Sequence, residues 1–168
     1  LHIDFDVTWV NWAAYESATA RSTAHFDVQV PAGIPLAIPP DPKPTQILPP
    51  EFQNRLVPHV GVEYLVAVGD SVELPVRAGY VYEKSPVPPQ TGITNFVDAD
   101  RHVLSAGTGV RLAHPSAELP GDVRIDLHVQ YSLLPERVVL KTNPADFVGD
   151  YRASGNLLAG GATLSLGF

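Results

Sequence analysis

The sequence has no cysteine, few charged residues and no long apolar run. Without cysteine, neither a disulfide framework nor a thiolate metal site can form. A transmembrane helix needs about 18 or more consecutive apolar residues, and no such run occurs. Charged residues are 17% of the 168 residues, and the net charge of −7 argues against nucleic acid as a partner. A membrane-spanning β-barrel is not excluded, because alternating polar residues lower the hydropathy of its strands.

What the sequence does have is a repeated alternation of apolar and polar residues. Because the side chains of a strand point alternately to its two faces, this pattern predicts strands with one apolar and one polar face. The clearest example has apolar Val123, Ile125, Leu127, Val129 and Tyr131 between polar Arg124, Asp126, His128 and Gln130. The pattern predicts six strands, at residues 1–15, 55–68, 72–83, 101–112, 123–133 and 156–168. No segment has the pattern of a helix.

Long and short connections alternate between these predicted strands. The pattern predicts long loops at residues 16–52, 85–100 and 141–154, and shorter turns at residues 68–70 and 113–122. The first loop is rich in proline, which lacks an N–H group and interrupts a regular ladder. We predict an ordered loop there, and not a linker between domains, because it contains apolar Ile34, Leu36, Ile38, Ile47 and Leu48. Residues 25–30 within it fit either a strand extension or a small hairpin.

The length of the predicted strands favours a membrane over water. Strands of soluble sheets have about five or six residues, and strands that cross a bilayer need about nine to eleven. The polar faces carry charges of both signs, which suits an aqueous lumen better than a packed core. The fold class predicted is therefore all-β, an antiparallel transmembrane β-barrel. Closed barrels need about eight strands or more, so we expect residues 1–168 to be the C-terminal part of one larger barrel domain whose other strands precede Leu1.

The position of the last residue predicts the orientation of the barrel. Phe168 ends an alternating strand, as a terminal phenylalanine does on the periplasmic side of outer-membrane barrels. The short turns are then periplasmic and the long loops lie outside the cell, which agrees with the usual asymmetry of such barrels. Tyrosine and tryptophan residues fit the aromatic girdles at the two membrane interfaces, namely Trp9, Tyr15, Tyr64, Tyr80, Tyr82 and Tyr131.

Several segments together resemble one family. They are VTWVNWAAY at residues 7–15, GVEYLVAVGDSVELPVRAG at 61–79, RAGYVYEKSPVP at 77–88 and DADRHVLSAGTGVRL at 98–112. In sequence, order and spacing, these segments and Phe168 resemble the FadL-like outer-membrane transporters of long-chain fatty acids and other hydrophobic compounds. The resemblance covers nearly the whole chain.

The resemblance implies a function as well as a fold. It implies a protein of the Gram-negative outer membrane, with an N-terminal plug and a lateral wall opening outside this segment. Hydrophobic molecules would pass by diffusion, without a cofactor, and we expect the protein to act as a monomer. Its partners would be the hydrophobic ligand and the lipid of the outer membrane. The motifs do not distinguish a fatty acid from an aromatic hydrocarbon.

Five residues are predicted to bind the ligand. Arg55, Arg77 and Arg101 lie on the polar faces of three successive strands and would supply positive potential for a carboxylate. Phe52 and Phe96 would supply apolar contacts near the outer ends of those strands. Members of the family often have a lysine directly after the aromatic residue that precedes the strand predicted at 55–68, which is Phe52 in this chain. Here Gln53 stands at that position, with Arg55 two residues further on.

The remaining charged residues have two interpretations each. Asp98 and Asp100, with Arg101, form either a salt-bridged loop anchor or the lining of an upper pocket. Arg77, with Glu73 and Glu83, forms either a network in the lumen or part of the ligand path. Histidines occur on different strands without ligand spacing, which argues against a metal site; they are His2, His59, His102, His114 and His128. No serine-centred elbow or other nucleophile motif is present, so we do not expect an enzyme.

Two other functions remain open at this point. A general porin-like channel for polar solutes would share the barrel, although the apolar loop residues Ile34, Leu36, Ile38 and Phe96 argue against it. A soluble β-sandwich that binds a ligand would share the alternating strands, although the strand lengths argue against it.

Overall fold

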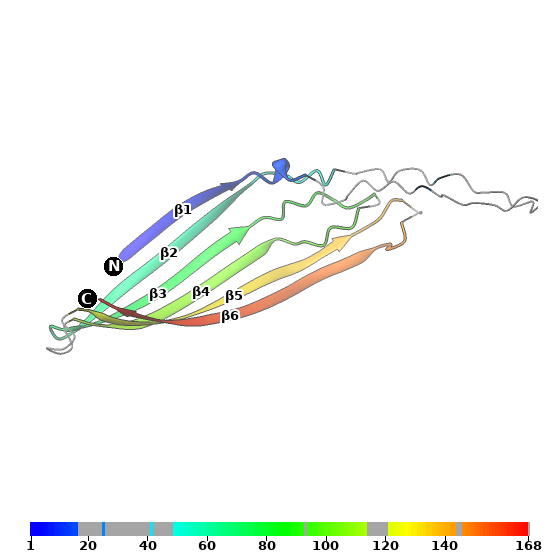
Figure 1. The fold of residues 1–168 in the computed structure, drawn as a ribbon. Helices are drawn as coiled ribbons and strands as arrows, with labels where there is room; N and C mark the ends of the chain where they lie inside the picture. The colour runs from blue at the N-terminus through cyan, green and yellow to red at the C-terminus, as the bar shows by residue number, and fades with distance from the viewer. Residues whose placement is uncertain are drawn as a thin grey trace, which may run out of the picture.

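The computed structural model describes residues 1–16, 25, 41, 49–92, 94–113, 121–143 and 146–167. Within these ranges the protein is all-β and forms one six-stranded antiparallel sheet in which each strand pairs with the next along the chain (Figure 1). The strands are β1 (His2–Val10), β2 (Arg55–Val68), β3 (Val72–Glu83), β4 (Arg101–Leu112), β5 (Val123–Val139) and β6 (Tyr151–Leu166). A single short 3-10 turn, η1 (Trp12–Ala14), follows β1.

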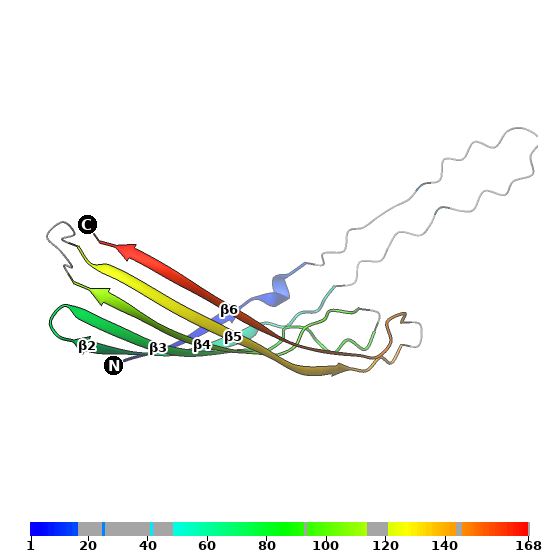
Figure 2. The ribbon, with the colours of Figure 1, turned by 90° about the horizontal axis from the view of Figure 1, so that it is seen from below.

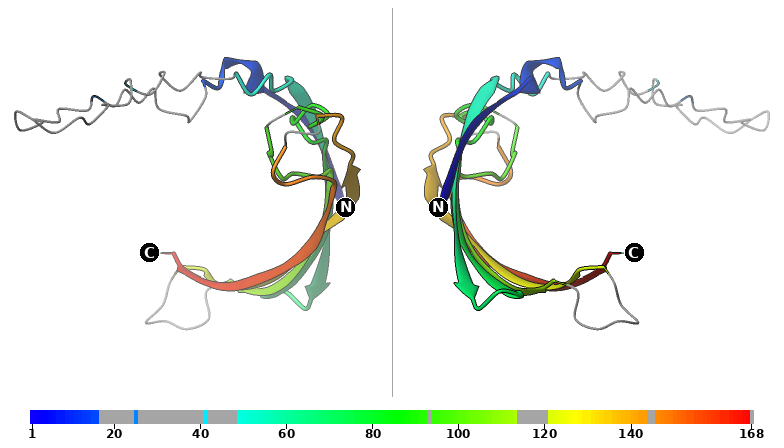
Figure 3. Two further views of the ribbon diagram at one scale, coloured as in Figure 1. Left: turned by 90° about the vertical axis from the view of Figure 1, so that its right-hand side faces the viewer. Right: turned by 90° about the vertical axis from the view of Figure 1, so that its left-hand side faces the viewer.

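The sheet is curved and open. Viewed along its strands it forms an arc (Figure 3), and β1 and β6 are its two edges, so it is not closed within the described part of the chain. The β2–β3 turn lies at one end of the strands, while the β3–β4 and β5–β6 loops lie together at the other end (Figures 1 and 2). In the described ranges, the structure contains no helix of the length and apolarity required to span a membrane.

One face of the sheet is apolar and exposed. The strand register places apolar side chains side by side across the sheet, as in the pairs Phe5–Val60, Tyr80–Leu104 and Leu104–Tyr131. The exposed fraction of Phe5 is 73% and that of Leu158 is 69%. Soluble monomeric proteins rarely expose apolar patches larger than a few hundred Å², so this face needs an apolar environment.

The packed core is small and lies at the loop end of the sheet. The buried apolar residues of the described ranges are Val57, Val87, Ala99, Val103 and Val139. Val87 and Ala99 belong to the β3–β4 loop, which therefore packs against the ends of the strands. At the loop end of the sheet, this loop covers the polar face that lies opposite the apolar one.

The opposite, polar face is crossed by ion pairs. Arg111 on β4 bonds Glu73 on β3 and Asp122 before β5. Arg77 on β3 bonds Glu63 on β2 and Asp126 on β5. Arg77 lies in a charge network, as one interpretation of the sequence expected, but its partners are not Glu73 and Glu83, because strand register places Glu63 directly opposite Arg77 and places Glu73 opposite Arg111.

The bounds predicted for β2, β3 and β4 are confirmed, and those of the outer strands differ. β1 ends at Val10 and not at residue 15, because the chain turns into η1, where the N–H of Ala13 donates to Asn54 Oδ1 at 2.8 Å. β5 continues past residue 133, and β6 begins at Tyr151, so the loop predicted at 141–154 is shorter than expected. A register shift between Leu134 and Arg137 absorbs Pro135 and lets the pairing resume.

Some predictions fall on residues outside the described ranges. These are the apolar residues Ile34, Leu36, Ile38, Ile47 and Leu48, all but the first residue of the possible strand extension or hairpin at 25–30, most of the turn at 113–122, and Phe168. The short turn at 68–70 is described, and Gly69 adopts φ +69°, a left-handed conformation that favours glycine.

Candidate functional site

Four of the five predicted ligand-binding residues line one cavity. This loop pocket has a volume of about 490 Å³ and lies on the polar face, where β2, β3 and β4 meet the β3–β4 loop. It contains Phe52, Arg55, Phe96 and Arg101. Its other lining residues are largely apolar and include Val10, Trp12, Val57, Val87, Val97 and Leu134. The sequence placed these residues at strand ends, and strand pairing brings them together.

An aromatic cluster forms one side of the loop pocket. The rings of Phe52 and Phe96 meet edge to face, with centroids 5.0 Å apart. Trp12 also meets Phe52 edge to face at 6.3 Å, and Tyr15 stacks on Phe52 at 5.6 Å. Such pairs add to the stability of apolar packing beyond the area that they bury. The cluster therefore fixes a rigid apolar wall.

Trp12 and Tyr15 were not predicted at this site. They were assigned to a continuous first strand, with Tyr15 in an interfacial girdle. The sequence does contain a signal, because Trp12 falls on the polar parity of that strand, where Asp4, Asp6 and Thr8 also lie. That break in the alternation marks the end of β1 and the start of η1.

Arg55 brings a positive charge without a carboxylate partner to the loop pocket. Its Nε donates to Ser85 O at 2.8 Å, its Nη1 to Asn54 O at 3.2 Å and its Nη2 to Gln53 Oε1 at 2.8 Å. All three acceptors are neutral. No carboxylate in the described ranges lies within ion-pair distance of this half-buried guanidinium, although Glu83 and Asp98 also line the loop pocket.

The other two arginines differ from Arg55. Arg101 pairs with Glu83, to whose Oε2 its Nε donates at 2.7 Å, so its charge is largely neutralised. Arg77 does not reach the loop pocket. It lies further down the polar face, where its Nε is 2.5 Å from Glu63 Oε2 and its Nη1 is 2.6 Å from Asp126 Oδ1.

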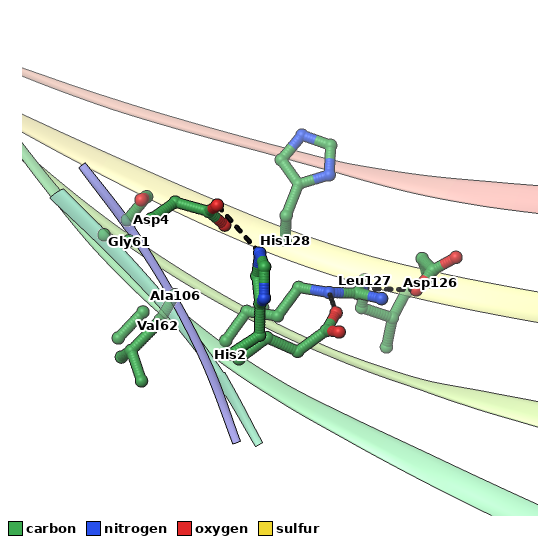
Figure 4. Close-up of a pocket in the computed structure, with 14 residues that line it drawn as sticks. His2, Asp4, Gly61, Val62, Ala106, Asp126, Leu127 and His128 are labelled. Carbon is green, nitrogen blue, oxygen red and sulfur yellow. Dashed lines mark hydrogen bonds and ion pairs between the residues drawn. The ribbon is translucent and has the colours of Figure 1, made fainter. Parts of the chain in front are cut away.

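Arg77 lines a second cavity of about 520 Å³, the mid-sheet groove, shown in Figure 4. Gly61, Gly79 and Gly107 contribute backbone to it, its charged side chains are Asp4, Glu63, Arg77 and Asp126, and His2 and His128 also line it. Figure 4 shows the His2 ring against the Asp4 carboxylate, with 2.7 Å between Nε2 and Oδ1. Carboxylates outnumber guanidinium groups in this groove, which suits water and polar groups better than an apolar ligand.

Asp98 and Asp100 hold the start of the β3–β4 loop. Asp100 accepts the Ser85 N–H at 2.9 Å and the Tyr82 hydroxyl at 2.8 Å, and Asp98 accepts the Ser85 hydroxyl at 2.8 Å. Burial raises the pKa of Asp100, but these two bonds outweigh it and hold that pKa below its usual value of 3.8. Both aspartates are loop anchors, and they act through hydrogen bonds and not through an ion pair with Arg101. Asp98 also lines the loop pocket.

Arg137 on β5 is a further anchor that sequence reasoning missed. It donates to Val87 O at 2.8 Å, to Ser85 Oγ at 2.9 Å, and to Pro88 O and Asp98 O at 3.2 Å each. It was missed because β5 was expected to end before the bulge. The guanidinium fixes both ends of the β3–β4 loop to β5.

No group of three or more metal-ligating side chains that could hold a metal ion occurs among the residues described. Comparison of the chain with family models, with curated proteins and with solved structures gave no match. The resemblance to FadL-like transporters therefore rests on the sequence segments quoted above and stays a hypothesis.

Proposed function

We propose that this chain is part of an outer-membrane β-barrel of a Gram-negative bacterium that admits long-chain fatty acids or similar hydrophobic compounds. The observation that carries the proposal is the loop pocket, in which aromatic walls adjoin the guanidinium of Arg55. A largely apolar cavity that presents a guanidinium without an ion pair in the described ranges fits an amphipathic ligand with a single carboxylate, although Lys84, Arg101, Glu83 and Asp98 also line it.

The exposed apolar face supports a membrane environment. It extends over all six strands, and in the described ranges no second layer packs on it. Tyr64 lies toward the turn end of this face, while Trp9 and Tyr82 lie toward the loop end, as expected for two aromatic girdles. In a bilayer the unpaired edges of β1 and β6 would be costly. We therefore infer that further strands complete the barrel.

The ion pairs of the three arginines differ, and this difference indicates which of them would bind a ligand carboxylate. Arg77 and Arg101 are already bonded to carboxylates, so a ligand carboxylate would have to compete with Asp126 or Glu83. Arg55 bonds only neutral oxygens and retains its charge. We assign Arg55 as the head-group residue, with Phe52 and Phe96 as contacts for the apolar part. Transport would be passive, down the gradient of the ligand.

The mid-sheet groove favours a second candidate, a channel for polar solutes. Its carboxylates and Arg77 resemble the lining of an aqueous pore. A soluble β-sandwich is the weaker alternative, because the apolar face has no covering sheet in the described ranges.

Liposomes containing the full-length protein separate these functions. We expect uptake of oleate to exceed that of protein-free liposomes, without swelling in isotonic sugar solutions. Swelling with sugars, without oleate uptake, would indicate the polar channel. Recovery of the protein in the soluble fraction without detergent would indicate the soluble binding module and contradict the proposal.

A further inference from the structure

A buried ion pair in the β5–β6 loop bonds the β3–β4 loop close to the loop pocket. Lys141 and Asp146, both in the β5–β6 loop, lie with 2.8 Å between Nζ and Oδ2, and each side chain is only 3% exposed. A buried pair is retained only when further hydrogen bonds satisfy its charges, because taking the charges out of water is costly. The additional hydrogen-bond partners of this pair therefore show which segment of the chain it fixes in place.

Those partners belong to the β3–β4 loop. Lys141 Nζ donates to Gly92 O at 3.0 Å and to Thr94 O at 2.7 Å. Asn95 of the same loop bonds the Asp146 carboxylate. The adjacent Thr142 adds a backbone bond, from its N–H to Thr91 O at 3.1 Å. The ion pair thus bonds the residues just before Phe96.

Both the backbone N–H and the backbone carbonyl of Phe96 form hydrogen bonds with side chains. Its N–H donates to Oε1 of Gln90, a residue that is only 3% exposed. Its carbonyl accepts the hydroxyl of Tyr151, at 3.4 Å, from the first residue of β6. The ring of Tyr151 in turn lies 5.9 Å from Lys141 Nζ. The backbone of Phe96 is therefore bonded to one side chain from each of the two loop regions.

We propose that the Lys141–Asp146 pair is a latch that fixes the β3–β4 loop on the β5–β6 loop and thereby positions Phe96 in the wall of the loop pocket. Lys141 and Asp146 are positioning residues, because neither lines the pocket. Only the consequence for ligand affinity rests on the proposed function. The latch itself is a property of the loops and is testable without a ligand.

The test is hydrogen exchange of the backbone amides of residues 90–97 in the full-length protein in detergent. Asp146→Asn leaves Lys141 buried without its counter-charge, and we expect exchange in this segment to rise about tenfold or more. The double variant Lys141→Met with Asp146→Leu leaves no buried charge and should fold. It should still raise exchange, because the bonds to Gly92, Thr94 and Asn95 are lost.

Glu136→Gln is the matched control. Glu136 on β5 pairs with Arg152 on β6 at 3.2 Å, but both side chains are at least half exposed and bond no described residue of the β3–β4 loop. We expect it to leave exchange of residues 90–97 unchanged. An equal rise in this control, or no rise in either latch variant, would overturn the latch.

Oleate binding separates the latch from the proposed function. Where the wild-type protein binds oleate, Asp146→Asn should weaken binding severalfold in parallel with the rise in exchange. Increased exchange with unchanged oleate affinity would overturn the positioning of Phe96. If the wild-type protein does not bind oleate, the proposed function fails, while the exchange result still decides the latch.

Discussion

Arg77 on β3 and Asp126 on β5 form an ion pair across the strand between them, with 2.6 Å between Nη1 and Oδ1. The pair can form because β4 presents Gly107 and Gly109 on this face. A Cβ added at Gly109 would lie 2.6 Å from Asp126 Oδ1 and 2.5 Å from the carbonyl oxygen of Ile125. The contact with the Ile125 carbonyl requires a shift of the backbone, and the contact with Asp126 Oδ1 requires the carboxylate to move.

The first prediction concerns this glycine. Gly109→Ala should lower the free energy of unfolding by about 1–3 kcal/mol, the usual cost of overpacking. Gly61→Ala is the matched control on the same face, because its nearest heavy atom would be Asp4 Cβ at 4.0 Å, an ordinary contact. Urea unfolding of the two variants in detergent measures the difference. A greater loss for Gly61→Ala would contradict the arrangement of β4 and β5.

The second prediction concerns the two faces of β5. Leu127, which is 52% exposed on the apolar face, should meet lipid. Leu127→Arg should therefore cost about 2–4 kcal/mol if it lies near the bilayer midplane. Gln130→Arg, on the polar face, should have little effect. Unfolding from bilayers measures both, and a larger cost at Gln130 would reverse the assignment of the faces.

The third prediction concerns orientation. Phe147 in the β5–β6 loop is fully exposed, and Asp70 is exposed in the β2–β3 turn. With cysteine at each site in turn, an impermeant thiol reagent on intact cells should label Phe147→Cys and not Asp70→Cys. Gln90 is unsuitable for this purpose, because it is 3% exposed. Labelling of Asp70→Cys alone would contradict the proposed orientation of the sheet in the membrane.

The fourth prediction concerns the effect of low pH on the Lys141–Asp146 pair. The bond with Lys141, followed by those with the Val148 N–H and with Asn95, holds the pKa of Asp146 below its usual value of 3.8. A lowered pKa contributes stability that is present above the usual value and is lost as the pH falls through the lowered one. The other charged groups here are Lys141 and Asp150, which accepts the Lys141 N–H.

Protection of residues 90–97 against hydrogen exchange should therefore be constant from about pH 5 to 8, after correction for the intrinsic rate, and fall only in stronger acid. Asp146→Asn should remove part of this acid transition. Asp100 also has a lowered pKa, and it should account for a further part. A transition near neutral pH that Asp146→Asn abolishes would contradict this assignment.

The sequence was sufficient for the central strands and for grouping four of the residues that line the loop pocket. β2, β3 and β4 alternate over most of their length, with exceptions such as Val57 and Val103, so the pattern gives both their bounds and their faces. Phe52, Arg55, Phe96 and Arg101 lie at strand ends that antiparallel neighbours share, which is why they were predicted together.

The sequence was insufficient wherever the answer depended on register or on loops. The partners of Arg77 follow from which residue stands opposite it, and alternation does not specify that. Pro135 and Glu136 interrupt the alternation of β5, so its continuation beyond the bulge was missed. The contacts of Arg137 and Lys141 are made with loop carbonyl groups, which leave no pattern in the sequence.

The most direct test of the account is oleate binding to Arg55→Ala and Arg101→Ala in the full-length protein. A ligand carboxylate bonded to Arg55 should lose about 1.5–3 kcal/mol, roughly ten- to a hundredfold in affinity, when that side chain is removed. Arg101→Ala should change affinity little, because Arg101 is paired with Glu83. An uncharged hydrocarbon should bind both variants as it binds the wild-type protein. If Arg55→Ala inserts, folds and binds oleate with unchanged affinity, Arg55 does not hold the head group and the assignment of the loop pocket is wrong.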